Sequence, residues 1–222
     1  MWAKNKIIID LDNTLYPEEM GIFTQVNNKI NLFLKEKMGF QEDKIDNIRL
    51  EYMRRYGTTL RGLMVNFNLA PDEYLRYVHD VEIESILKKD NDLDLLLSEL
   101  KGEKVIFTNG ASFYAERILN ALGIKRHFSK IFDIVSMDYI AKPHPYGFDK
   151  LMSSFGNGTD YNYLFIDDMA ENVSTAKKKG MTTVLIDNFS NKRLGRNVEK
   201  IADYVVKKIL DIKPYLESTP FI

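Results

Sequence analysis

The apolar pattern of the chain begins with a short run that no polar residue interrupts. Residues 7–9 are three consecutive isoleucines, which predict a strand buried on both faces. Asp10 and Asp12 follow this strand directly. Two carboxylates at the end of a buried strand are unfavourable unless a cation or a reaction uses them. This strand end is therefore predicted to carry the chemistry of the protein.

Beyond the first strand, the apolar positions lie three and four residues apart, which is typical of amphipathic helices. The spacing predicts a helix that has Pro17 in its first turn and ends near Gly39. Four further helices are predicted, at 43–56, 58–67, 71–79 and 91–100. The stretch between the first strand and residue 103 therefore contains no predicted strand.

From residue 103 onward, strands and helices alternate. The predicted strands are 105–107, 131–135, 163–166, 182–186 and an edge strand at 204–206. The predicted helices are 111–122, 146–155, 171–179 and a last helix near the end of the chain. This alternation predicts an α/β fold with a parallel sheet and helices on both faces. We expect residues 1–15 and 99–222 to form the core domain and residues 16–98 to form an inserted helical cap over the carboxyl ends of the strands.

Polar residues follow three more of the predicted strands. They are Thr108, Asn109 and Gly110 after the second strand, Lys142 in a loop after the third, and Asp167 and Asp168 after the fourth. Because the carboxyl ends of parallel strands meet at one edge of a sheet, these residues should converge with Asp10 and Asp12.

The composition argues against binding to nucleic acids or membranes. The 222 residues are 45% apolar and carry a net charge of −1, so the chain has no global basic field for a nucleic acid polymer or an anionic membrane. It contains no cysteine and no apolar run that approaches the roughly 20 residues of a membrane span. No targeting segment precedes the first strand, and we expect a cytoplasmic protein. The oligomeric state is not predicted.

The four strand ends together resemble the motifs of the haloacid dehalogenase (HAD) superfamily, whose phosphatases use an aspartate nucleophile. The DxDxT motif matches Asp10, Asp12 and Thr14, the Ser or Thr motif matches Thr108, the lysine motif matches Lys142, and the acidic pair matches Asp167 and Asp168. The resemblance implies a Rossmann-like core, and the inserted helices resemble the C1 cap of that superfamily. The segments DLDNTLYP, YGTTLRGL and FIDDMAENV are similar to those of the pyrimidine 5′-nucleotidase branch.

The resemblance implies a Mg²⁺-dependent phosphatase acting on a small phosphorylated metabolite, most of all a pyrimidine 5′-nucleotide. Asp10 would be the nucleophile, and Asp12 the acid and then the base. The metal ligands would be Asp10, the backbone carbonyl of Asp12, Asp167 and Asp168, and the phosphate-binding groups Thr108, Asn109, Gly110 and Lys142. The charges also call for a cation at this site, since a carboxylate and a phosphate oxygen at 4 Å repel by about 4 kcal/mol at an effective dielectric near 20. A cation and a lysine would cancel that repulsion.

Each of these residues also has a structural interpretation. Residues 108–110 could be a simple turn, Lys142 could be a solvated loop lysine, and one of Asp167 and Asp168 could only cap the following helix. Asn172 could support the site or lie on the surface. Within the cap, Tyr56 and Arg61 are candidates for substrate specificity, although an arginine of a helix is more often exposed. The histidines His79, His127 and His144 are not expected to bind a hard cation.

Several other functions use a similar architecture. A sugar-phosphate phosphatase or a β-phosphoglucomutase-like isomerase would share the site, and the isomerase would move phosphate without releasing it. A haloacid dehalogenase would also use an aspartate nucleophile, but the uncharged carbon that it attacks needs no metal. A receiver-type signalling module is about half this length, and a catalytically inactive binding protein would not need every motif position filled.

Overall fold

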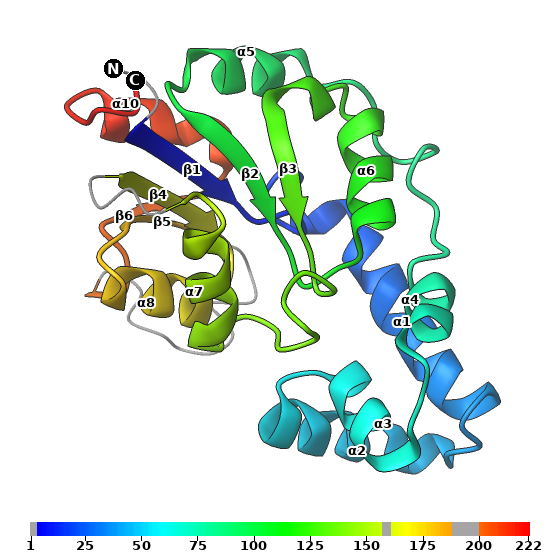
Figure 1. The fold of residues 1–222 in the computed structure, drawn as a ribbon. Coiled ribbons are helices and arrows are strands. Elements are labelled where there is room, and N and C mark those ends of the chain that lie inside the picture. Colours follow the sequence, from blue (N-terminus) through cyan, green and yellow to red (C-terminus); the bar gives the residue numbers. More distant parts are fainter. Residues whose placement is uncertain (1–3, 157–160, 188–199) are drawn as a thin grey trace.

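A computed structural model describes residues 4–156, 161–187 and 200–222 of the chain (Figure 1). Six parallel strands form one sheet in the order β3-β2-β1-β4-β5-β6. Their bounds are Asn5–Ile9 for β1, Glu103–Phe107 for β2, Phe128–Phe132 for β3, Asn162–Asp167 for β4, Thr182–Ile186 for β5 and Tyr204–Val206 for β6. The protein therefore has the predicted α/β fold with a parallel sheet.

Strand β1 lies at the centre of the sheet. Ile8 pairs with Val105 of β2 on one side and with Phe165 of β4 on the other. All three isoleucines of β1 are fully buried, because helices cover both faces of the sheet. The uninterrupted apolar run in the sequence is thus explained by the central position of this strand.

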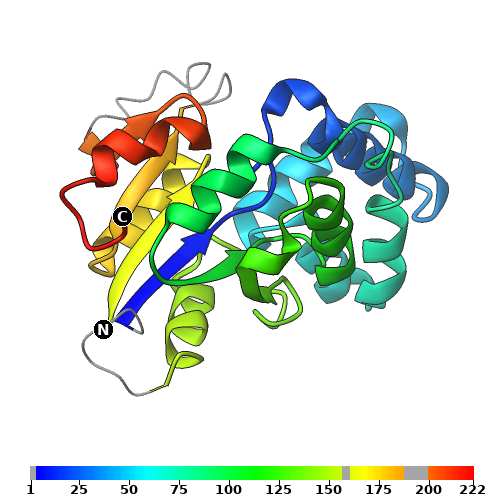
Figure 2. The ribbon, with the colours of Figure 1, turned by 90° about the horizontal axis from the view of Figure 1, so that it is seen from above.

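Helices cover the two faces of the sheet in separate layers. Ile7 and Ile9 pack with α5 (Asn91–Glu99), α6 (Ser112–Ala121), η5 (Ile209–Ile212) and α10 (Lys213–Leu216). Ile8 points to the other face, where α7 (Pro145–Ser153) and α8 (Ala170–Lys178) lie. Figure 2 shows α5 and the C-terminal helices on one side of the strands and α7 on the other. The short helix η3 (Lys125–His127) leads into β3.

A helical region separates β1 from β2 in the sequence. It contains η2 (Glu18–Met20), α1 (Ile22–Glu36), α2 (Glu42–Tyr56), α3 (Thr59–Phe67) and α4 (Pro71–Val78). In Figure 1 these helices lie beyond the arrowheads of β2 and β3, at the carboxyl end of the sheet. The division into a core domain and a cap remains a prediction. Leu93, Leu96 and Leu97 of α5 pack in one cluster with Ile7 and Ile9, and α5 also contacts η5 near the end of the chain. The packing therefore favours ending the inserted cap before α5.

Two predicted elements were wrong at their ends. The helix expected at Pro17 begins at Ile22, because Gly21 adopts a left-handed φ of 71° that ends η2 and breaks a continuous helix. The third strand, predicted at 131–135, ends at Phe132. Asp133 turns the chain there, accepting hydrogen bonds from the backbone N–H groups of Ser112 and Ser136 at 2.9 Å each. Among the described residues, every helix is too short or too polar to span a bilayer.

Candidate active site

The end of β1 fixes Asp10 at the carboxyl edge of the sheet. Its backbone N–H donates to the Ile166 carbonyl at 2.9 Å, which continues the pairing with β4 by one residue. The chain then turns through Asn13, which adopts a left-handed φ of 56°. This turn brings Thr14 back toward the strand end, where its hydroxyl donates to Oδ2 of Asp10 at 3.1 Å. Oδ1 of Asp10 is left for a group from another loop.

Lys142 supplies that group from the loop that follows β3. Its ammonium donates to Asp10 Oδ1 at 2.7 Å, to Asp167 Oδ2 at 2.8 Å and to the Phe107 carbonyl at 2.6 Å. The side chain is only 1% exposed. Burial alone would lower the pKa of Lys142, but the two carboxylates outweigh burial and raise it above its usual value. The lysine is therefore a permanent cation between two carboxylates, and it is not the solvated loop lysine of the alternative interpretation.

Asn109 holds the loop that carries Lys142. Its side-chain amide donates to the Lys142 carbonyl at 3.1 Å and accepts from the Lys142 backbone N–H at 2.9 Å. The N–H of Gly110 donates to the Thr108 hydroxyl oxygen at 2.9 Å, and Thr108 is almost completely buried. Residues 108–110 thus form a tight turn, and Asn109 also fixes the position of the lysine.

Three carboxylates meet next to this lysine. Asp10, Asp167 and Asp168 are all buried, and one carboxylate oxygen from each lies within 4.8 Å of the others. Burial raises the pKa of Asp167 to about 6 although Lys142 opposes the shift, and burial with the charges of Asp167 and Asp10 raises the pKa of Asp168 well above its usual value. Three acids facing one ammonium leave excess negative charge, which a hard divalent cation such as Mg²⁺ would neutralise.

Asp167 is held in place by the start of α8. The Met169 backbone N–H donates to its Oδ1 at 2.8 Å, and the Asn172 amide donates to both carboxylate oxygens at 3.0 Å. Asn172 is buried, so it supports the acidic group and is not a surface residue. Asp167 therefore combines a backbone hydrogen bond at the start of the helix with a place in the acidic cluster.

The Asp12 carboxylate is not one of the three clustered acids. Its Oδ1 accepts hydrogen bonds from the hydroxyls of Tyr16 at 2.5 Å and Tyr114 at 2.6 Å. Burial raises the pKa of Asp12 to about 6, and the two tyrosine hydrogen bonds oppose that shift. Burial and the negative charge of Asp12 raise the pKa of both phenols, so both hydroxyls stay protonated. Near neutral pH, Asp12 can therefore either release or accept a proton.

Sequence reasoning missed Tyr16, Tyr114 and His79. Tyr16 lies four residues after Asp12, a spacing that could have indicated contact across the turn. Tyr114 comes from α6, and nothing in the sequence pattern relates it to Asp12. His79 follows α4, and its ring stacks on Tyr114 with centroids 4.4 Å apart. His144, which lies close to Lys142 in the sequence, instead caps α7, accepting the Tyr146 N–H at 3.2 Å.

Two cap residues predicted to select the substrate make contacts of their own. The Tyr56 hydroxyl lies 3.5 Å from Asn66 Oδ1, and Arg61 donates to the Asp138 carbonyl at 3.1 Å. Asp138 belongs to the loop after β3, so Arg61 connects the inserted helices to the core. Within residues 4–156, 161–187 and 200–222, no hydrogen bond joins Tyr56 or Arg61 to the acidic cluster.

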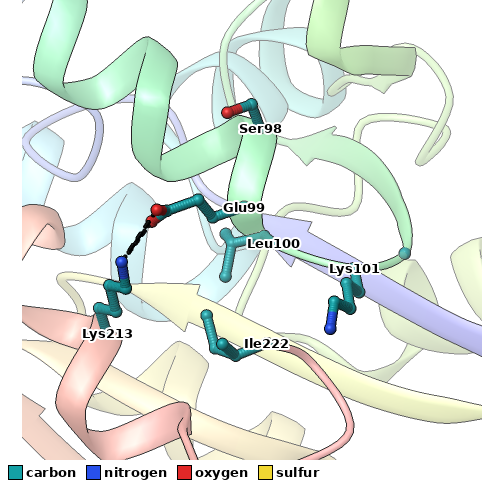
Figure 3. A pocket seen from close by; sticks show the side chains of 7 residues that line it. Ser98, Glu99, Leu100, Lys101, Lys213 and Ile222 are labelled. Atoms are coloured by element: carbon teal, nitrogen blue, oxygen red, sulfur yellow. Dashed lines mark hydrogen bonds and ion pairs between the residues drawn. The ribbon is translucent and has the colours of Figure 1, made fainter.

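A pocket of about 610 Å³ lies at the other end of the sheet (Figure 3). Its lining comes from the residues just before β2 and from the C-terminal segment, and its walls are joined by an ion pair of Lys213 and Glu99 at 2.8 Å. It contains none of the predicted site residues. The chemistry is therefore expected at the carboxyl edge of the sheet and not in this pocket.

Comparisons with known proteins agree with this site. The family of haloacid dehalogenase-like hydrolases matches residues 6–180. Phosphate metabolism protein 8 of Saccharomyces cerevisiae is 29% identical over 199 residues, which cover 82% of this chain and 61% of the yeast protein. The chain thus spans less than two thirds of that relative.

Solved structures share the fold across almost the whole chain. A HAD phosphatase from Thermococcus onnurineus superposes with a TM-score of 0.61 at 20% identity, covering 96% of this chain and 98% of the other. The L-2-haloacid dehalogenase of Xanthobacter autotrophicus superposes with a TM-score of 0.57 at 18% identity and the same coverage of both chains. Because the family match spans residues 6–180, which include all four strand ends of the site, this chain belongs to the haloacid dehalogenase-like hydrolases.

Proposed function

We propose that the protein is a Mg²⁺-dependent phosphatase that hydrolyses small phosphomonoesters through an aspartyl-phosphate. Pyrimidine 5′-nucleotides are its favoured substrate class. The observation that carries the proposal is the position of Asp10, which accepts a hydrogen bond from the Lys142 ammonium and forms one buried cluster with the carboxylates of Asp167 and Asp168. The Lys142 ammonium, together with a divalent cation that the three carboxylates would hold, would offset the charge of a dianionic substrate beside the nucleophile.

In the first step, a carboxylate oxygen of Asp10 attacks phosphorus, and the bond from phosphorus to the ester oxygen breaks. Asp12 gives its proton to the departing oxygen, which leaves as a neutral alcohol. Asp10, Asp167 and Asp168 would hold Mg²⁺, which supplies positive charge to the phosphoryl group. Lys142 adds a permanent positive charge beside the nucleophile.

In the second step, Asp12 is a carboxylate and accepts a proton from water. The water oxygen attacks phosphorus, and the bond from phosphorus to Asp10 breaks. Inorganic phosphate is released, and both aspartates return to their starting protonation states. One residue can serve as acid and then base because its pKa of about 6 lies close to neutral pH.

Residues 108–110 would bind the phosphoryl oxygens. The Thr108 hydroxyl oxygen already accepts the Gly110 N–H, so its own proton is available for donation to a phosphoryl oxygen. The Asn109 side chain is occupied with the Lys142 loop, which leaves only its backbone N–H for the substrate. This division of roles refines the sequence-based assignment of Asn109.

Two observations favour phosphate esters over haloacids. A haloacid substrate carries no leaving oxygen that needs a proton, so Asp12 and the paired acids at 167 and 168 would serve no purpose. The yeast relative carries phosphate metabolism in its name, which agrees with a phosphorylated substrate. The preference for pyrimidine nucleotides depends on the YGTTLRGL segment, in which Tyr56 and Arg61 are the proposed specificity residues.

The test is phosphate release in Mg²⁺ from a panel of nucleoside monophosphates and sugar phosphates. The Asp10→Asn variant serves as the blank, because its amide cannot attack phosphorus and its shape is nearly unchanged. We expect release from UMP and CMP to exceed release from the other esters, and chelation of the metal to stop it.

Other outcomes point to other members of the family. Release mainly from sugar phosphates would keep the phosphatase and reject the nucleotide preference. Relocation of phosphate on a sugar without release would indicate a mutase. Turnover of a haloacid without metal would reject the phosphatase.

A further inference from the structure

Asp12 is held by two phenols from different parts of the chain. Tyr16 belongs to the segment that leaves β1, and Tyr114 belongs to α6 on the face of the sheet. Both hydroxyls donate to the same oxygen, Oδ1, at 2.5 and 2.6 Å. Both rings are almost completely buried, so each hydroxyl requires a partner and has Asp12 as that partner.

The other oxygen of Asp12 is available for proton transfer. Across residues 4–156, 161–187 and 200–222, no side chain or backbone group donates to Oδ2. An acid that carries its proton on Oδ2 keeps Oδ1 as an acceptor for both phenols. A carboxylate that has lost the proton keeps the same two hydrogen bonds. The two hydroxyls can therefore fix the carboxyl plane in both steps without moving.

The Tyr114 ring is supported from the inserted region. The His79 ring stacks on it with an interplanar angle of 20°, and His79 is only 5% exposed. Arg117, one helical turn after Tyr114, donates to the carbonyls of His79 at 3.2 Å and Val81 at 2.9 Å. One face of α6 thus holds both the phenol and the segment that supports it.

Building on the proposed function, we infer that Tyr16 and Tyr114 are positioning residues that hold the Asp12 carboxyl group with Oδ2 directed to the leaving oxygen of the ester. The need for this alignment depends on the leaving group. An alkoxide leaves only with a proton, whereas an activated aryl oxide leaves as a stable anion.

The test compares kcat/KM for an alkyl phosphate with kcat/KM for p-nitrophenyl phosphate, both in Mg²⁺. This quantity reports the step in which the ester bond breaks, which is the step that needs the acid. We expect Tyr16→Phe and Tyr114→Phe each to lower kcat/KM for the alkyl phosphate on the order of 10- to 100-fold. The value for p-nitrophenyl phosphate should stay close to that of the wild type.

Two reference variants give the largest and the smallest expected difference in kcat/KM between the two esters. Asp12→Asn removes the acid itself and defines the largest difference between the two esters. Tyr74→Phe makes the same chemical change at a buried tyrosine of α4 whose ring packs against Phe33, and it should alter neither ester. Should Tyr114→Phe unfold, Tyr16→Phe decides the question alone.

If Tyr16→Phe and Tyr114→Phe lower kcat/KM equally for both esters, or for neither, the positioning role is overturned. Failure of the proposed function would be seen differently, as an absence of turnover by the wild-type protein on both esters.

Discussion

The ammonium of Lys142 lies 2.7 Å from Asp10 Oδ1, although 132 positions separate the two residues in the chain. The same ammonium lies 2.8 Å from Asp167, which a third strand end supplies. Both carboxylates are buried, and this one ammonium supplies positive charge to both of them. Stability and reactivity of the site therefore depend on the same lysine.

Replacing Lys142 with Met should destabilise the fold and abolish turnover. Removing one partner of a buried ion pair typically costs about 3–5 kcal/mol. Burial already raises the pKa of Asp167, and without the lysine this pKa rises further. The unfolded chain then loses the proton at a pH where the folded protein keeps it, so stability falls as pH rises. Urea unfolding without Mg²⁺ should consequently show that the variant loses more of the free energy of unfolding at pH 8 than at pH 5. Lys150→Met, which breaks an exposed pair with Asp138, is the control and should change stability by less than about 1 kcal/mol. A loss as small as that of the control would contradict the role of Lys142.

Mg²⁺ should stabilise the wild-type protein through the acidic cluster. At a concentration of 100 times Kd, a ligand that binds only the folded state adds about 2.7 kcal/mol. Asp168→Asn removes one of the three carboxylates and should abolish most of the Mg²⁺-dependent rise in Tm. Asp46→Asn changes an exposed acid of α2 and should keep the full rise. If Mg²⁺ raises the Tm of Asp168→Asn as much as that of the wild type, Asp168 is excluded as a ligand.

His79 should make the fold less stable in acid. Burial lowers its pKa from 6.5 to about 4, and the nearby Arg117 acts in the same direction. The unfolded chain therefore binds a proton at a pH where the folded protein does not, so stability falls as pH decreases from 6.5 to 4. The full effect corresponds to roughly 3 kcal/mol.

The measurement is the free energy of unfolding between pH 7 and pH 4, compared with His79→Phe. The phenyl ring keeps the stack on Tyr114 but cannot titrate, so the variant should lose stability less steeply in this range. Parallel curves for the two proteins would show that His79 does not titrate as its burial predicts.

Gly62 allows α2 and α3 to approach each other closely. A Cβ atom at this position would lie 2.3 Å from Cγ of Tyr52, well inside contact distance. Gly62→Ala should therefore cost about 1–3 kcal/mol through overpacking, although alanine favours a helix more than glycine does.

The double variant with Tyr52→Ala separates these two effects. With the ring removed, Gly62→Ala should become neutral or stabilising by up to about 1 kcal/mol. Chemical denaturation of the two single variants and the double variant completes the cycle. If Gly62→Ala destabilises the Tyr52→Ala protein as much as it destabilises the wild type, the clash with the Tyr52 ring is not the cause.

Local patterns in the sequence determined the elements and most of the acidic site. Three consecutive isoleucines required a strand covered on both faces, and alternation after residue 103 required parallel strands. Since parallel strands end at one edge, the sequence also predicted that Asp10, Lys142 and Asp167 converge, and the hydrogen bonds of Lys142 confirm it. The catalytic roles of these residues remain predictions.

Only the tertiary structure decided which side chains surround Asp12. Tyr114 and Asp12 are 102 positions apart, and their contact depends on how α6 is placed on the sheet. The stack of His79 on Tyr114 likewise depends on where the inserted helices return to the core. Periodicity shows which face of an element is buried, but the meeting of two particular side chains is set by the relative position of whole elements, and no local pattern encodes that position.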